Sequence, residues 1–123
     1  MNIAEGDMKD RMEAGVEILM NVMKNDYLEW SRRGRDPHGR SHEMYEEFCN
    51  KLHYTVGRKY IKVVSDNSVS AFIVNCVDDK KFQFGDVLLP AGWAAPARNH
   101  ARCSVFDTIS MERNMRWTGP CYR

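Results

Sequence analysis

Apolar residues recur at spacings of three and four along residues 5–33, which is the repeat of an amphipathic α-helix. The repeat consists of Met8, Met12, Val16, Leu19, Met23, Tyr27 and Trp30. Ile18, Met20 and Val22 widen this stripe beyond the width that a small sheet would cover. We therefore expect one long helix, part of which is covered by a second copy of the protein. The alternative is an ordinary core helix that packs on its own sheet.

A loop and a shorter helix are predicted next. Residues 34–40 contain two glycines and one proline, which indicates a loop, and with the two residues before them they carry four arginines. Ser41 is a typical N-cap residue and acidic residues follow it, so we expect a helix that runs to about His53. Its apolar face consists of Tyr45, Phe48, Cys49 and Leu52. Both helices belong to a helical region at residues 1–56.

From residue 57 the pattern changes to short runs typical of β-strands, which turn residues separate. We expect strands at residues 59–65, 69–76, 81–84, 87–89 and 102–107, and a last strand at 113–118 with Trp117 buried. Short connections predict an antiparallel meander, and the prolines and small residues of 90–101 predict a loop. The sequence thus predicts a single α+β domain over residues 1–123. In it, the two helices pack on an antiparallel sheet, and residues 57–123 form that sheet and a ligand-binding loop.

Composition and charge make several classes of protein improbable. The 123 residues are 43% hydrophobic and 28% charged, and a net charge of +1 does not indicate a polyanionic partner. The four cysteines are far apart, and the N-terminus is acidic and polar, unlike a signal peptide. We therefore expect reduced thiols in a cytoplasmic protein. No apolar run approaches the roughly 20 residues that a membrane span requires, so we expect no membrane partner.

The motifs of common enzymes and metal sites are missing from the sequence. The four histidines and four cysteines show no zinc-ligand spacing, and neither a nucleophile elbow nor a glycine-rich phosphate loop occurs. Cys103 follows His100 by three residues, but we expect a buried cysteine there rather than a catalytic pair. We therefore expect a protein that is not an enzyme and that uses neither a metal nor a cofactor.

Residues 82–107 have the composition of a ligand-binding segment. Their small residues allow a ligand to approach the backbone, and the rings of Phe82 and Trp93 offer faces on which a base can stack. Arg98 and Arg102 suit phosphate oxygens, and they point the same way if this stretch is one helical turn. The alternative is a packed lid, with Trp93 in the core and the two arginines in solvent.

Five segments in the second half of the chain resemble a family of phage proteins. They are residues 60–64, 68–74, 84–88, 93–98 and 101–102. Together they are similar to the first-described type of Thoeris anti-defence protein, and the segment from Trp93 to Arg102 is the most specific part. The chain departs from this family at Leu89 and Gly92, where members carry lysine and serine. Any ligand contact made by those two side chains is therefore lost.

The resemblance implies that the chain captures, without cleavage, cyclic ADP-ribose isomers that bacterial TIR enzymes make from NAD. It also implies a place in the host bacterial cytoplasm, dimer units that assemble as hexamers in some members, and a separate site for cyclic oligonucleotides in some members. The expected ligand contacts are Lys62, Phe82, Trp93, Arg98, Asn99, Arg102 and Ser104. Phe82 or Trp93 would stack on adenine, while the arginines and Lys62 would neutralise the pyrophosphate. The arginine-rich loop at residues 32–40 of a neighbouring copy would enter the same pocket.

Three other functions stay open. The chief alternative is a small nucleic-acid-binding accessory protein, because residues 90–123 carry five arginines against two acidic residues. A second is an enzyme that acts on a nucleotide with Asp86 or His100 as its base. A third is a protein–protein inhibitor built on the long helix.

Overall fold

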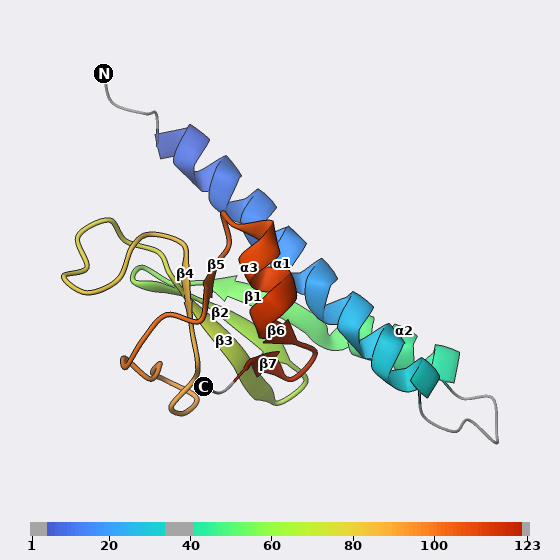
Figure 1. Ribbon diagram of the computed structural model, residues 1–123. Helices are drawn as coiled ribbons and strands as arrows, with labels where there is room; N and C mark the ends of the chain where they lie inside the picture. Colours follow the sequence, from blue (N-terminus) through green and yellow to red (C-terminus); the bar gives the residue numbers. More distant parts are fainter. Residues whose placement is uncertain (1–4, 34–40, 122–123) are drawn as a thin grey trace.

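The computed structural model describes residues 5–33 and 41–121. The fold is α+β, as predicted, with a long N-terminal helix and shorter helices against an antiparallel sheet (Figure 1). Helix α1, Glu5–Arg33, has the predicted bounds, and α2, Ser41–Lys51, begins where expected. The predicted arginine-rich loop at residues 34–40 lies outside the described residues. Among the residues that are described, no helix is long and apolar enough to cross a bilayer.

Five strands form one antiparallel sheet in the order β1-β2-β3-β4-β5, so that each strand pairs with its neighbour in sequence. Their bounds are Leu52–Val56, Tyr60–Ser65, Ser68–Val74, Asp86–Leu88 and Cys103–Ser104. This order confirms the predicted meander. The β2–β3 turn contains Asp66 at a φ of 57°, a conformation that aspartate tolerates better than most residues.

Helix α1 covers one face of the sheet. Figure 1 shows α1 along one side of the molecule and the loops that follow β3 and β4 on the other side. The larger apolar cluster joins the stripe of α1 to Ile61, Val63, Ala71, Ile73 and Val87 of the sheet. The chain itself therefore covers most of the stripe for which we expected a second copy. On α1, Ile18 and Trp30 stay 38% and 50% exposed.

The opposite face of the sheet carries a smaller apolar cluster. Successive side chains of a strand point to opposite faces, so Phe72 and Val74 of β3 point away from α1. Phe82 and Leu88 complete this cluster, and Phe82 comes from a loop rather than from a strand. Connections between strands, and not a helix, therefore cover this face, and the candidate site lies among them.

The prediction for residues 52–56 was wrong. We expected the second helix to continue to about His53, but α2 ends at Lys51 and β1 begins at Leu52. Leu52 and Tyr54 pack in the larger cluster whereas Thr55 is exposed, which is the two-residue alternation of a strand. The sheet therefore begins before the predicted boundary at residue 57.

No strand forms at residues 81–84, where we predicted one. The Asp79 carboxylate accepts hydrogen bonds from the backbone N–H groups of Lys81 and Phe82, at 2.9 Å each. Because these donors are used within a turn, they are not free to pair in a ladder. The strand predicted at residues 102–107 is also shorter than expected, since only Cys103–Ser104 pairs with β4.

The C-terminal segment differs from the single strand expected at residues 113–118. Asp107 accepts a hydrogen bond from the Ser110 N–H and so caps helix α3, Thr108–Asn114, which we did not predict. A hairpin of β6, Met115–Arg116, and β7, Gly119–Pro120, follows. Trp117, expected to be buried, is half-buried at the turn of this hairpin. Its backbone N–H donates to Asp26 of α1 at 2.9 Å, which ties the hairpin to the helix.

The tight approach of β7 to β3 requires the glycine at position 119. Its φ is +123°, and a Cβ there would lie 2.4 Å from the Ser70 carbonyl oxygen. We expect Gly119→Ala to lower the free energy of unfolding by about 1–3 kcal/mol, measured by urea denaturation. The control is Gly92→Ala, because a Cβ at that position meets nothing within 4 Å. Equal stability of the two variants would contradict this account of the hairpin.

Candidate functional site

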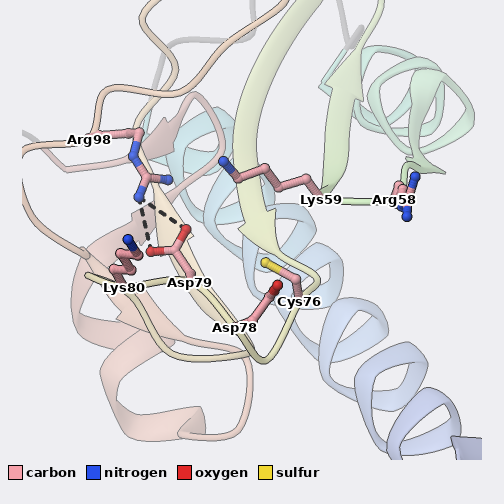
Figure 2. Close-up of a pocket in the computed structure, with 7 residues that line it drawn as sticks. All are labelled: Arg58, Lys59, Cys76, Asp78, Asp79, Lys80 and Arg98. Atoms are coloured by element: carbon pink, nitrogen blue, oxygen red, sulfur yellow. Dashed lines mark hydrogen bonds and ion pairs between the residues drawn. The ribbon is translucent and has the colours of Figure 1, made fainter.

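Four cationic side chains surround one hollow of about 520 Å³ on the side of the sheet away from α1 (Figure 2). We call it the basic hollow, and it is lined by Arg58, Lys59, Cys76, Asp78, Asp79, Lys80 and Arg98. In Figure 2 the Lys59 side chain extends across the opening toward Arg98, and Arg58 stands at the far side. Four positive side chains against two carboxylates leave the lining with an excess of positive charge, which favours an anionic ligand.

The topology of the sheet explains why these side chains meet. In an antiparallel meander the first and third connections lie at the same end of the sheet. Residues 57–59 form the first connection and residues 75–85 the third, so the cations of both lie at the same end of the sheet. Arg98 comes from the long connection between β4 and β5. The Ala97 N–H donates to the Leu89 carbonyl at 2.7 Å, and Pro90 pairs with Pro96, which closes residues 90–96 into a small loop before Arg98.

Arg98 joins the β4–β5 connection to the rest of the site through hydrogen bonds. Its Nη2 donates to both carboxylate oxygens of Asp79 at 2.9 and 3.0 Å, and its Nη1 donates to the Tyr60 hydroxyl at 2.5 Å. Lys81 Nζ donates to the Arg98 carbonyl at 2.7 Å. The guanidinium carbon also lies 4.9 Å from the centre of the Phe82 ring, within the range of a cation–π contact. Three separate segments are therefore joined at one guanidinium group.

Asp79 is the acceptor at the centre of this network. Its side chain is 2% exposed, although it lines the hollow. Hydrogen bonds from Arg98 and from the backbone N–H groups of Phe82 and Lys81 hold the pKa of the Asp79 carboxyl well below its usual range. The carboxylate is thus charged at neutral pH and compensates the charge of Arg98. The charges in the hollow that remain available to a ligand are mainly those of Arg58, Lys59 and Lys80.

A second hollow, of about 330 Å³, adjoins the basic hollow, because Arg58 and Lys59 line both. We call it the sheet-side hollow, and its other lining residues are Thr55, Val56, Gly57, Tyr60, Lys62, Phe72 and Ala94. Lys62 Nζ lies 4.6 Å from the centre of the Trp93 ring and 5.7 Å from that of Phe72. Trp93 is 58% exposed, so the packed-lid alternative does not hold for this side chain. Lys62 and Trp93, two of the predicted contacts, therefore lie together.

Phe82 is placed differently from the free ring face that we expected. It is 6% exposed and packs in the cluster with Phe72, Val74 and Leu88. Arg98 and Lys81 both lie over its ring, at 4.9 and 5.5 Å from the ring centre. Phe82 therefore supports the side chains of the site from beneath.

Arg102 and Arg98 do not lie on one helical turn, since residues 90–101 contain no helix. Arg102 is buried, and it donates to the Cys121 carbonyl at 3.0 Å and to Asn99 Oδ1 at 3.4 Å. Its Nε is a buried donor with no acceptor among the described residues. None of the described carboxylates forms an ion pair with this buried cation, and a buried charge without such a partner is costly. Asn99 is exposed beside it.

Ser104 lies apart from the two hollows. Its Oγ accepts from the Phe106 N–H at 3.1 Å, and its backbone N–H donates to Ser110 Oγ at 3.2 Å. Ser104 thus joins β5 to the start of α3, and it does not line the basic hollow or the sheet-side hollow.

Two cysteine thiols, one in the basic hollow and one in the core, are held in the protonated form. Burial, followed by the charge of Asp78, raises the pKa of Cys76 in the basic hollow. Burial raises the pKa of Cys103 to about 12, and this cysteine is buried as predicted. Because the thiolate is the nucleophile, neither group is activated at neutral pH. Within the described ranges, no group of three or more His, Cys, Asp or Glu side chains could hold a metal ion.

Arg58, Lys59 and Lys80 were missed because composition does not distinguish them from ordinary turn residues. A usable signal was present, since the start of the strand predicted at residues 59–65 and the turn after the strand predicted at 69–76 lie at the same end of the predicted meander. Arg58 and Lys59 follow Gly57, and Lys80 follows two aspartates.

A family model with the description "Family of unknown function (DUF7717)" matches residues 3–123. The chain belongs to the DUF7717 family. The match spans both the helical region and the sheet of this DUF7717 protein, and thus includes every residue of the two hollows. Comparison with curated proteins and with solved structures finds no match.

The charge of Asp79 makes the stability of this DUF7717 protein depend on pH. Because its folded-state pKa is lowered, the carboxylate stabilises the fold above its unfolded-state pKa of about 3.9. That contribution is lost as pH falls through the lower, folded-state pKa. We expect Asp79→Asn to reduce the urea midpoint at pH 7 and to reduce the difference between the midpoints at pH 7 and pH 3. Asp78→Asn is the control, because Asp78 is exposed in the same loop. Identical pH profiles for wild type and Asp79→Asn would contradict the assignment.

Proposed function

We propose that the chain captures a small, phosphate-bearing cyclic nucleotide and releases it unchanged. The observation that carries this proposal is the basic hollow, in which Arg58, Lys59, Lys80 and Arg98 surround about 520 Å³. That volume lies within the range of about 300–1,000 Å³ that small-molecule sites occupy. The neighbouring sheet-side hollow adds Lys62, and Trp93 adds an exposed aromatic ring beside it. Cations next to a ring suit a ligand that has both phosphates and a base.

The resemblance to Thoeris anti-defence proteins supports a more specific ligand, a cyclic ADP-ribose isomer made by TIR enzymes. In this proposal the protein acts in the cytoplasm of the host bacterium and removes the signal before its effector binds it. Capture of this kind requires nanomolar affinity, which corresponds to about −12 kcal/mol. The raised pKa values of the Cys76 and Cys103 thiols support capture rather than thiol-dependent cleavage of the ligand.

A homo-oligomer is part of the proposal, because a small ligand reaches such affinity only when it is nearly enclosed. Both hollows are open on one side of this chain, so a second copy would supply the missing wall. The exposed side chains of Ile18 and Trp30 lie on α1, away from the two hollows, so they would form a separate apolar interface between copies.

Retention of an intact ligand tests the capture function. We expect the purified protein, incubated with cyclic ADP-ribose isomers and freed of excess ligand, to release unaltered isomer on heating, as measured by mass spectrometry. The double variant Lys59→Gln, Lys80→Gln removes two of the free charges and should lower affinity at least about tenfold. Arg113→Gln is the matched control, because Arg113 is an exposed arginine of α3 outside both hollows.

Each result of this experiment decides between functions. An altered product would show an enzyme instead of a capture protein. No retention of any isomer would reject the proposal. If the protein instead bound long polynucleotides, with affinity falling steeply as salt rises, the nucleic-acid alternative would replace it.

The oligomer is tested by mass in solution. One chain has a mass of 14.3 kDa, and we expect light scattering after size exclusion to give a multiple of this value. The double variant Ile18→Glu, Trp30→Glu should shift the mass toward one chain, because it places charge where apolar side chains would be covered. A wild-type monomer that still retains the ligand would contradict the shared enclosure but leave capture itself in place.

A further inference from the structure

Arg98 presents its guanidinium group to the basic hollow in a fixed orientation. Two of its nitrogens are occupied in the plane of the group, because Nη2 donates to Asp79 and Nη1 donates to Tyr60. The Lys81 amine also holds the backbone of Arg98 through its carbonyl. Most of the hydrogen-bonding edge of this arginine is therefore already used within the protein, and less of it is left for a phosphate.

The guanidinium group also lies over an aromatic ring. The guanidinium carbon lies 4.9 Å from the centre of the Phe82 ring, and Phe82 itself is 6% exposed. The Arg98 side chain is nevertheless 38% exposed and lines the hollow. With Phe82 on one side of the group and bonds along its edge, the part of the guanidinium group left for a ligand in the hollow is the side away from Phe82.

The distribution of charge also separates Arg98 from the other cations. Asp79 compensates its charge at 2.9 and 3.0 Å, whereas no such pair is formed by Arg58, Lys59 or Lys80 with the described residues. A guanidinium plane that is compensated in this way still offers a flat, polarisable surface, and proteins stack unpaired bases on such planes.

We infer that Arg98 is a stacking platform for the base of the ligand, supported from beneath by Phe82 and held flat by Asp79 and Tyr60. This inference rests on the proposed function and deepens it, because it requires a ligand with a nucleobase. It changes the roles that the sequence suggested, in which Phe82 or Trp93 stacked on the base and Arg98 was one of the cations that neutralised phosphate. The phosphates are then bound by Arg58, Lys59 and Lys80, and Asp79 and Tyr60 act as positioning residues.

AMP and ribose 5-phosphate test the inference, because the two probes differ only by the adenine base. We expect the wild-type protein to bind AMP about five- to one-hundred-fold more tightly than ribose 5-phosphate, measured by NMR titration. Arg98→Lys keeps the charge and can still pair with Asp79, but it removes the flat face. It should bring the AMP preference close to one while the affinity for ribose 5-phosphate stays unchanged. Tyr60→Phe, which removes one positioning bond, should reduce the preference by a smaller factor.

Two further variants distinguish stacking from charge. Lys80→Gln should weaken both probes by the same factor and leave the AMP preference intact. Trp93→Ala compares the second exposed flat surface with Arg98, and a preference that is lost in Trp93→Ala but kept in Arg98→Lys would overturn the inference in favour of Trp93. Urea denaturation of Arg98→Lys shows whether the loop is still folded, and Tyr60→Phe gives the answer if it is not.

The remaining outcomes separate this inference from the proposed function. If wild type binds both probes equally, or if Arg98→Lys keeps the preference, base stacking on Arg98 is wrong while capture of a phosphate ligand stands. If neither probe nor any cyclic ADP-ribose isomer binds, the proposed function and the inference both fail.

Discussion

The ion pair between Asp79 and Arg98 holds two long connections against the face of the sheet that α1 leaves open. The apolar stripe of α1 packs on the other face, so loops cover this one. The backbone N–H and C=O groups of these loops are not paired in a sheet ladder and need other hydrogen-bond partners. The Asp79 carboxylate supplies part of these partners, because it accepts hydrogen bonds from two backbone N–H groups of its own loop. The same carboxylate then binds the guanidinium group of the second connection, so one side chain orders both segments.

That arrangement also determines what the site can offer to a ligand. A carboxylate inside a positively charged hollow would normally weaken anion binding, but here it is 2% exposed and already satisfied by Arg98 and the backbone. The ion pair compensates the charge of Arg98 and fixes the position of its guanidinium group. The uncompensated positive charge of the basic hollow therefore belongs to Arg58, Lys59 and Lys80. In the proposed site, phosphate recognition and base recognition would be separated in space, although one set of contacts organises both.

The strongly periodic parts of the fold could be predicted because a single element determines them. Helix α1 has a repeat of 3.6 residues over 29 residues, and its bounds follow from that repeat alone. The meander followed from short connections between β-rich runs. The errors lie where a bond between a side chain and the backbone of its own turn, or a pattern that fits two elements, changes the outcome. Asp79 prevents a strand at residues 81–84, and Leu52 belongs to a helical pattern and a strand pattern at once.

The composition of residues 82–107 predicted a site built from arginines and aromatic rings. Of the predicted contacts, Arg98 lines the basic hollow, Lys62 lines the sheet-side hollow, and Trp93 lies beside Lys62. The sequence did not indicate that Phe82 would be covered or that Arg102 would be buried, since both depend on which loop crosses the sheet and where.

The amino-acid sequence by itself thus determined the long helix and the antiparallel meander, because local periodicity and turn residues encode these features. It also predicted a ligand-binding segment from residue types alone. Only the tertiary structure decided which cations share a hollow and which face of Arg98 is open. Those properties arise from contacts between segments 19 to 38 residues apart, such as the bonds of Arg98 to Asp79 and Tyr60. Local pattern carries no information about contacts at that separation, since they depend on which loops the tertiary fold brings together.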